Sequence, residues 1–284
     1  MRFGILRRVR PIIRIFGFEG GYALTATDEG WLKALKVFPR YLAKGLRRVL
    51  PPPVKTGLRR VLRLMHVPRA RVLIRVEPLS ELWGSDRGFP IHRYYLEQFL
   101  QEFAFDIRGH CLEFQEDAYT TRYGGSAIVD LGILHIDDSN PLATIVADLT
   151  KPNDIPSNRF DCIICTHVLH VIFELDRAVS ELYRVLKPGG VLLVAVPHVS
   201  MCDPQWHELW RFTSEGLLEV LATAFGAGNV AVRAYGNSLT AAGEIRGLVA
   251  HEFAKVELDY HDPRFAVEVC ARAVKLPGGT EEGP

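Results

Sequence analysis

The sequence predicts an α/β protein with a doubly wound, mainly parallel sheet that has helices on both faces. Residues 162–165 and 191–196 are uninterrupted apolar runs, which are typical of parallel strands covered on both sides. Between them, apolar residues recur at helical spacing, at Ala178, Val179, Leu182, Val185 and Leu186. The order is therefore strand, helix, strand, which parallel sheets join by a right-handed crossover.

The helix in this unit is expected to end at residues 187–190, Lys-Pro-Gly-Gly. Proline cannot continue a helix, and glycine tolerates the left-handed conformation of a C-terminal cap. In open parallel sheets, ligands bind beyond the carboxyl ends of the strands. The polar residues that follow the two strands are therefore expected to face a ligand, and they include Thr166, His167, His170 and His198.

Residues 160–197 resemble the central part of class I S-adenosylmethionine-dependent methyltransferases, which share the apolar strand led by Asp161 and the Leu-Lys-Pro-Gly-Gly turn at 186–190. Two further segments are similar to the type 11 subgroup often found beside glycosyltransferases: Gly-Phe-Pro-Ile-His-Arg-Tyr-Tyr at 88–95 and Tyr-Thr-Thr-Arg-Tyr-Gly at 119–124. The resemblance implies a Rossmann-like, seven-stranded sheet with an antiparallel edge strand, and S-adenosylmethionine as cofactor. Another doubly wound domain is the alternative.

The remaining strands are expected at 110–114, 133–137, 143–149, 229–235 and 266–274, with a helix over 241–254 before the last strand. A helix with Tyr95, Phe99 and Phe103 on one face begins near Ile91, and Thr213 or Ser214 is expected to cap a helix that starts near Glu215. The methyltransferase core is thus expected over residues 77–276, followed by a disordered tail at 277–284.

The resemblance assigns cofactor contacts to the ends of the first three strands. Glu113 would hold the ammonium group, Asp137 the ribose hydroxyls, and Asp148 the adenine amino group, with Leu149 beside the ring. Asp138 replaces Asp137 if the second strand ends one residue later. The full predicted set of cofactor-binding residues is Glu113, Gln115, Tyr119, Asp137, Asp138, Asp148, Leu149 and Thr166.

Gln115 departs from the family pattern, which has a glycine at this position so that the backbone approaches the cofactor closely. This departure leaves a second hypothesis open. The chain would then be a non-catalytic or repurposed methyltransferase-fold protein that binds a partner or a membrane surface.

Methyl transfer to a hydroxyl needs a positioned acceptor and a general base, and histidine suits the second role because its pKa is near neutrality. His167 and His198 are the predicted catalytic bases, since each follows a strand almost immediately; a packing role is the alternative for each. We predict O-methylation of a small polar or glycosylated acceptor, with nitrogen and carbon acceptors left open. The predicted acceptor-binding residues are His92, Arg93, Tyr94, His170, Trp206, His207, Trp210 and Arg211.

Residues 1–76 form a basic extension that differs in charge from the rest of the 284-residue chain. They contain 18 Lys or Arg and 3 Asp or Glu, whereas residues 77–284 contain 16 and 30. Apolar and basic residues alternate in a pattern that predicts helices. Three roles remain open for this extension: packing on the acidic half of the chain, contact with an anionic membrane surface, and nucleic-acid binding. The third is supported by charge alone, because the segment has no recognisable nucleic-acid-binding motif.

The five cysteines have no disulfide-framework spacing. Cys162 and Cys165 resemble a redox or metal pair only in spacing, because both lie in a predicted strand and no second pair completes a zinc site. We expect buried thiols and no metal. The sequence has no apolar run long enough for a membrane span and no signal-peptide pattern, so we expect a cytoplasmic protein, with membrane-peripheral association as the alternative.

Overall fold

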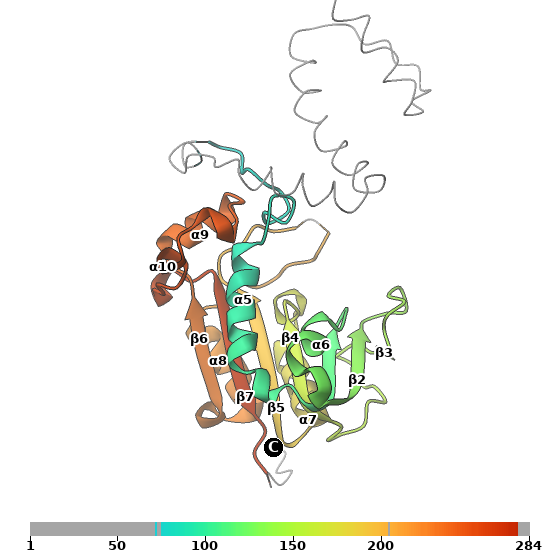
Figure 1. Cartoon of the computed structure of the whole chain (residues 1–284). Helices are drawn as coiled ribbons and strands as arrows, with labels where there is room; N and C mark the ends of the chain where they lie inside the picture. The colour runs from blue at the N-terminus through green and yellow to red at the C-terminus, as the bar shows by residue number, and fades with distance from the viewer. Residues whose placement is uncertain (1–71, 73–74, 204, 278–284) are drawn as a thin grey trace, which may run out of the picture. The chain divides into compact units, whose positions relative to one another are not determined.

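The computed structural model describes residues 72, 75–203 and 205–277, which contain a seven-stranded sheet in the order β3-β2-β1-β4-β5-β7-β6 (Figure 1). Strand β7 runs antiparallel to β5 and β6, and the pairs among β1 to β5 are parallel, which confirms the predicted fold class. The strands are β1 Gly109–Phe114, β2 Ile128–His135, β3 Ile145–Val146, β4 Phe160–Thr166, β5 Leu186–Pro197, β6 Val230–Tyr235 and β7 Glu268–Val274.

Helices cover both faces of this sheet. One apolar cluster joins α7 and α8 to the sheet residues Leu112, Ile163 and Leu192, and a second joins α5 to Cys111, Ile164 and Leu193 on the other face. Figure 1 shows α5 lying along this second face. The α-helices are α5 Ile91–Glu102, α6 Ala118–Gly124, α7 Leu175–Val185, α8 Ser214–Phe225, α9 Ser238–Ile245 and α10 Lys255–Leu258. Short 3₁₀ turns are η1 Ala104–Asp106, η2 Gly125–Ala127, η3 Leu169–Val171, η4 Ala227–Asn229, η5 Ala250–Glu252 and η6 Pro263–Phe265.

The central unit β4-α7-β5 forms as predicted, and α7 ends at Val185. The Lys-Pro-Gly-Gly segment, however, is an irregular part of β5 and not a turn outside it. Phe160 pairs with Leu186, whereas Cys162 pairs with Val191, so the extra residues bulge out of the ladder. Gly189 adopts a left-handed φ of 81° in this bulge and donates its N–H to the carbonyl of Lys275 at 2.7 Å.

Three predicted elements have different bounds. The second strand starts at Ile128 and ends at His135, two residues before Asp137, and the third is reduced to Ile145–Val146. The helix predicted over 241–254 is wrong as a single element: α9 starts at Ser238 and stops at Ile245. It stops because Gly247 has a φ of 69° and packs so tightly on Ser80 that an added Cβ would lie 2.7 Å from the Ser80 nitrogen.

Other local predictions are confirmed. Tyr95 and Phe99 on α5 are buried, and Thr213 caps α8 by accepting the N–H of Gly216 at 3.0 Å. Cys111, Cys162, Cys165 and Cys270 are buried free thiols, and burial raises the pKa of Cys165 above its ordinary value.

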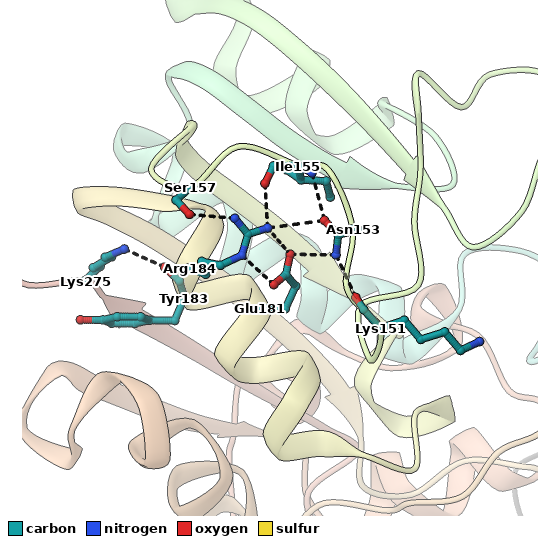
Figure 2. Close-up of polar contacts among 8 residues, drawn as sticks. All are labelled: Lys151, Asn153, Ile155, Ser157, Glu181, Tyr183, Arg184 and Lys275. Atoms are coloured by element: carbon teal, nitrogen blue, oxygen red, sulfur yellow. Dashed lines mark hydrogen bonds and ion pairs between the residues drawn. The ribbon is translucent and has the colours of Figure 1, made fainter. Parts of the chain in front are cut away.

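The loop after β3 is fastened to helix α7 by Arg184 (Figure 2). Its guanidinium donates to the carbonyl of Ile155 at 2.7 Å and to Ser157 Oγ at 2.8 Å, and it pairs with Glu181 at 2.6 Å. Glu181 also accepts from Asn153 Nδ2 at 2.9 Å. These contacts fix the path of residues 153–157, which are part of the connection between β3 and β4.

The predicted basic helical extension, residues 1–76, lies outside the described residues except for positions 72, 75 and 76, and the predicted tail lies outside them except for position 277. None of the described helices is long and apolar enough to cross a bilayer. Within the same residues, no group of three or more His, Cys, Asp or Glu side chains is arranged to hold a metal ion.

Candidate functional site

The carboxyl ends of β1, β2, β4 and β5 lie at one edge of the sheet, where ligands bind in open α/β folds. The antiparallel strand β7 begins at this same edge. Its first residue, Glu268, pairs with Pro197, the last residue of β5. A buried acid is thereby placed beside the residues that follow β4.

Glu113, at the end of β1, is buried and holds the start of helix α6. Its carboxylate accepts the backbone N–H of Thr120 at 2.7 Å and that of Tyr119 at 3.2 Å. Burial raises the pKa of Glu113, and the two backbone hydrogen bonds oppose this effect. The carboxylate thus shapes the loop predicted to border the cofactor.

Gln115 adopts the conformation that glycine would favour at this position. Its φ is 70°, its N–H donates to the carbonyl of Leu134 at 3.2 Å, and its own carbonyl accepts from Asn140 Nδ2 at 2.6 Å. The Gln115 side chain is exposed. The replacement of glycine therefore leaves the left-handed backbone of the loop in place.

The acids predicted to bind the nucleoside follow β2 and β3. Asp137 is exposed and accepts from the Ser139 hydroxyl at 2.5 Å and from the Ser139 N–H at 3.0 Å, and these hydrogen bonds lower the pKa of its carboxyl. Asp138 is its exposed neighbour. Asp148 pairs with Lys151 at 2.8 Å and accepts hydrogen bonds from Thr150, and these contacts lower the pKa of its carboxyl to about 2. Leu149 beside it is buried. An exposed, ionised carboxylate at Asp137 and an apolar side chain at Leu149 fit the ribose and adenine of the expected cofactor.

Helices α5 and α6 meet through Arg93 and Tyr119. The Arg93 guanidinium donates to the Tyr119 hydroxyl and lies 5.8 Å from the centre of its ring. Tyr94 instead donates its hydroxyl to Asp259 at 2.9 Å, beside α10. Arg93, a predicted acceptor-binding residue, therefore lies beside Tyr119, a predicted cofactor-binding residue, whereas Tyr94 contacts another part of the fold.

His167, directly after β4, forms a histidine–carboxylate pair. Its Nε2 lies 2.7 Å from Oε1 of Glu268, a side chain with no exposed surface. His167 has a φ of 54°, and its backbone N–H donates to the carbonyl of Ala195 at 2.8 Å. Thr166, which precedes it, pairs with Ala195 in the sheet.

Two more histidines surround His167. His92, at the start of α5, places Nδ1 2.7 Å from Oε1 of the buried Glu244, and its ring centre lies 5.5 Å from that of His167. The ring of His170 lies 6.1 Å from His167, and burial lowers the pKa of His170 to about 4. The structure thus brings together three of the predicted histidines.

His198 is placed differently. Its Nδ1 lies 2.7 Å from the backbone carbonyl of Phe212. A carbonyl can only accept, so this nitrogen carries the proton. The hydrogen bond orients the ring without a carboxylate behind it, and His167 therefore has the geometry of a general base more fully than His198.

Four of the predicted acceptor-binding residues, Trp206, His207, Trp210 and Arg211, lie in the loop after β5. Trp210 donates its indole N–H to the carbonyl of Ile172 at 2.7 Å. Its ring stacks on that of Phe173, with the ring centres 6.1 Å apart. Trp206 and His207 are exposed. The guanidinium of Arg211 pairs with Glu208 and donates to the carbonyl of Met201 at 3.1 Å. Because the N–H groups of Leu209 and Trp210 donate to the carbonyl of His170, this loop borders the histidine cluster.

Glu244 and Glu268 were missed by the sequence reasoning, although both are acids within apolar stretches. Glu268 opens the apolar run of β7, and the expected antiparallel direction of that strand is the signal that would have placed it at the ligand edge. Glu244 stands between Gly243 and Ile245 on α9, with no sequence signal for its partner on α5.

A family model described as a methyltransferase domain matches residues 92–194. The ubiquinone/menaquinone biosynthesis C-methyltransferase UbiE of Pasteurella multocida is 38% identical over 63 residues, which are 22% of this chain and 23% of that protein. The chain therefore matches about a quarter of the length of this relative.

Two solved structures have similar chain traces. An S-adenosylmethionine-dependent methyltransferase from Archaeoglobus fulgidus is 13% identical, with 64% of this chain and 94% of that chain covered and a TM-score of 0.45. The N-methyltransferase NodS of Bradyrhizobium japonicum, in complex with S-adenosyl-L-homocysteine, is 14% identical, with 72% and 95% covered and a TM-score of 0.42. The family match over 92–194, together with the seven-stranded sheet and its antiparallel strand β7, gives the described core the Rossmann-like fold of a methyltransferase domain.

Proposed function

We propose that the chain transfers a methyl group from S-adenosylmethionine to a hydroxyl oxygen of a small polar or glycosylated acceptor. The observation that carries this proposal is the pair of His167 and the fully buried Glu268, 2.7 Å apart at the carboxyl end of β4. A histidine oriented by a carboxylate is suited to accept a proton from a hydroxyl.

The roles of the individual residues follow from their positions. Asp137 would accept hydrogen bonds from the ribose hydroxyls, and Asp148 and Leu149 would border the adenine. When bound, the cofactor supplies a methyl group activated by the positive sulfur. Glu113 keeps the loop before α6 in shape, and Arg93 with Tyr119 ties α5 over that loop.

His167 would act on the acceptor through Nδ1, because Nε2 faces Glu268. A carboxylate cannot donate, so Nε2 carries the proton and Nδ1 remains free to accept one. After proton transfer, Glu268 would stabilise the imidazolium. Trp206, Trp210 and Arg211 lie in the loop that would border the acceptor, and His198 is the second candidate base.

Carbon methylation is the second candidate reaction, favoured by the partial match to UbiE, which is named as a C-methyltransferase. The same base would serve it by deprotonating a hydroxyl next to the reacting carbon. A non-catalytic role is less well supported, since the φ of Gln115 keeps the glycine-like loop on which that alternative depended.

The test measures transfer of radiolabelled methyl from S-adenosylmethionine into acceptor extracts by the full chain, with products identified by mass spectrometry and NMR. We expect His167→Asn and Glu268→Gln to lose at least about a hundredfold in rate while still binding S-adenosylhomocysteine. His110→Gln, near the start of β1 and thus at the opposite edge of the sheet, is the control. Unchanged rates in the first two variants would exclude His167 as the base.

For residues 1–76, we infer contact either with the acidic half of the chain or with an anionic membrane surface, on the basis of their excess of basic residues. Sedimentation of the full chain with neutral and anionic vesicles separates these roles. Salt-sensitive binding to anionic vesicles supports the membrane role, and its absence excludes that role.

A further inference from the structure

We propose that the acceptor carries two neighbouring hydroxyl groups, which two facing histidine–carboxylate pairs recognise: His167 with Glu268, and His92 with Glu244. This inference rests on the proposed methyl transfer and specifies its substrate class. It also gives His92 a defined role as an acceptor-binding residue.

The second pair is built as firmly as the first. Glu244 on α9 accepts from His92 in two places, with Oε1 2.7 Å from the ring Nδ1 and Oε2 3.3 Å from the backbone nitrogen. The Glu244 side chain is 1% exposed, whereas the His92 ring is 13% exposed and reaches the surface of the site. Glu244 therefore fixes the ring from behind and leaves its outer edge accessible.

The two pairs come from different parts of the chain but face one site. His92 starts helix α5, His167 follows strand β4, and their ring centres are 5.5 Å apart with planes tilted by 53°. Since Nδ1 of His92 and Nε2 of His167 face carboxylates, both carry protons. The nitrogens left over, Nε2 of His92 and Nδ1 of His167, are hydrogen-bond acceptors.

The surroundings add two polar atoms to this site, of which the carboxylate oxygen is an acceptor. Oε2 of Glu268 and Nδ1 of His170 are buried, and neither has a hydrogen-bond partner in the described residues. Buried polar atoms in native proteins are nearly always paired, and leaving one unpaired costs about 1–3 kcal/mol. A site with surplus acceptors is satisfied by a ligand that brings several donors.

Neighbouring hydroxyls match this arrangement. Their oxygens are separated by about one hydrogen-bond length, ~2.8 Å, so two rings in contact can each accept from one of them. A single hydroxyl would occupy one histidine and leave the other without a partner. An amine is the competing donor, because two buried carboxylates also favour a cation, and the test includes it.

In the reaction, His167 takes the proton of the hydroxyl to be methylated. That oxygen forms a bond to the methyl carbon as the carbon–sulfur bond breaks, and the electron pair of the broken bond stays on sulfur. The proton then passes from the histidine to solvent. The second hydroxyl keeps its proton, donates it in a hydrogen bond to the other histidine, and leaves the site unmethylated.

The experiment compares matched probes with the full chain and radiolabelled S-adenosylmethionine. The pairs are catechol with phenol, caffeate with 4-hydroxycinnamate, and cis-1,2-cyclohexanediol with cyclohexanol, and benzylamine represents amines. We expect at least one diol to be methylated about tenfold faster than its single-hydroxyl partner. In His92→Phe this preference should fall below about threefold, mainly through a higher KM for the diol.

Gln98→Ala is the matched control on the same helix, where Gln98 contacts Asp259 and not the histidines. It should retain the wild-type preference. Equal rates for diols and their partners, transfer to benzylamine alone, or transfer to no diol would overturn the inference. Binding of S-adenosylhomocysteine is measured in parallel for wild type and each variant. If the wild-type chain does not bind it, the proposed function is contradicted. If the wild-type chain binds it but shows no preference for diols, only the inference about the acceptor is contradicted.

Discussion

Gln115 and His167 share a backbone conformation that is unusual for residues other than glycine. Their φ values are 70° and 54°. A side chain in the left-handed region costs about 1–2 kcal/mol, and such residues cluster at functional sites. Both positions lie at the ligand edge of the sheet, one after β1 and one after β4. Two strained positions thus lie beside the polar groups of the site, although Asn158, which precedes β4 at the opposite edge, also has a positive φ of 56°.

Replacing Gln115 by glycine tests the conformation of the cofactor loop. Gln115→Gly should raise the free energy of unfolding by about 0.5–1 kcal/mol, because relief of the left-handed strain exceeds the entropy that glycine adds to the unfolded chain. Glu116→Gly, at the adjacent exposed position without a positive φ, should lower it by a similar amount. Urea denaturation measures both, and equal destabilisation of the two variants would contradict the loop geometry.

The buried His170 makes the free energy of unfolding depend on pH in the acid range. Burial lowers its pKa from 6.5 to about 4, so the unfolded chain binds a proton below pH 6.5 that the folded chain binds only below pH 4. The stability that depends on the neutral ring is therefore lost as the pH falls from 6.5 to 4. Its contribution over this range is about 3 kcal/mol, at about 1.4 kcal/mol for each unit of pKa.

The corresponding experiment follows the free energy of unfolding between pH 4 and 6.5. His170→Gln should flatten this dependence by about 3 kcal/mol relative to wild type. His207→Gln, which removes an exposed histidine, should leave the dependence unchanged. A His170→Gln profile parallel to that of wild type would show that the ring is not buried in its neutral form.

At the scale of elements, helix α7 organises the chain between β3 and β4 through one side chain. The Arg184 guanidinium bridges Glu181 on its own helix and the loop residues Ile155 and Ser157 (Figure 2). The loop continues from Asp148 and Leu149, the predicted adenine contacts. Its order thus bears on the cofactor side of the site.

Arg184→Ala should lower the free energy of unfolding by about 1–2 kcal/mol, since several charge-assisted hydrogen bonds are lost. Hydrogen exchange in residues 153–157 should become faster. Arg177→Ala is the control on the same helix, because Arg177 forms an ion pair with the exposed Glu174 one turn away, and such pairs contribute little. Exchange rates that change equally in both variants would argue against this anchor.

Sequence patterns predicted the central elements well, for physical reasons visible in particular residues. The apolar runs around Ile163 and Leu193 are buried on both faces, and the helical spacing of Val179 and Leu182 matches the buried side of α7. Such periodicity is local and can be read from the chain. The three histidines of the cluster were also predicted, because each stands in or near a recognisable segment.

What could not be predicted depends on contacts between distant segments. Glu244 meets His92 across 152 positions, and Glu268 meets His167 across 101. Strand β3 is short and α9 ends early at a tight contact with Ser80, which no local pattern encodes. The partners of the histidines, and hence the chemistry of the pairs, became visible only in the fold.

At the scale of the whole described core, the ligand edge divides into two sides. The ends of β1, β2 and β3 carry Glu113, Asp137 and Asp148, whereas β4 and β7 carry His167 and Glu268. Helix α5 joins the two, since His92 contacts the histidine cluster and Arg93 contacts Tyr119 beside the cofactor loop. One turn of helix thus connects the predicted cofactor side with the predicted acceptor side.

We infer that this edge binds S-adenosylmethionine with Asp137 on the ribose. Calorimetry of the full chain with S-adenosylhomocysteine tests this inference on wild type, Asp137→Ala and Asp138→Ala. We expect one molecule bound per chain, affinity weakened about tenfold in Asp137→Ala through loss of charge-assisted hydrogen bonds, and little change in Asp138→Ala. No binding to the wild-type chain at millimolar concentration would contradict it.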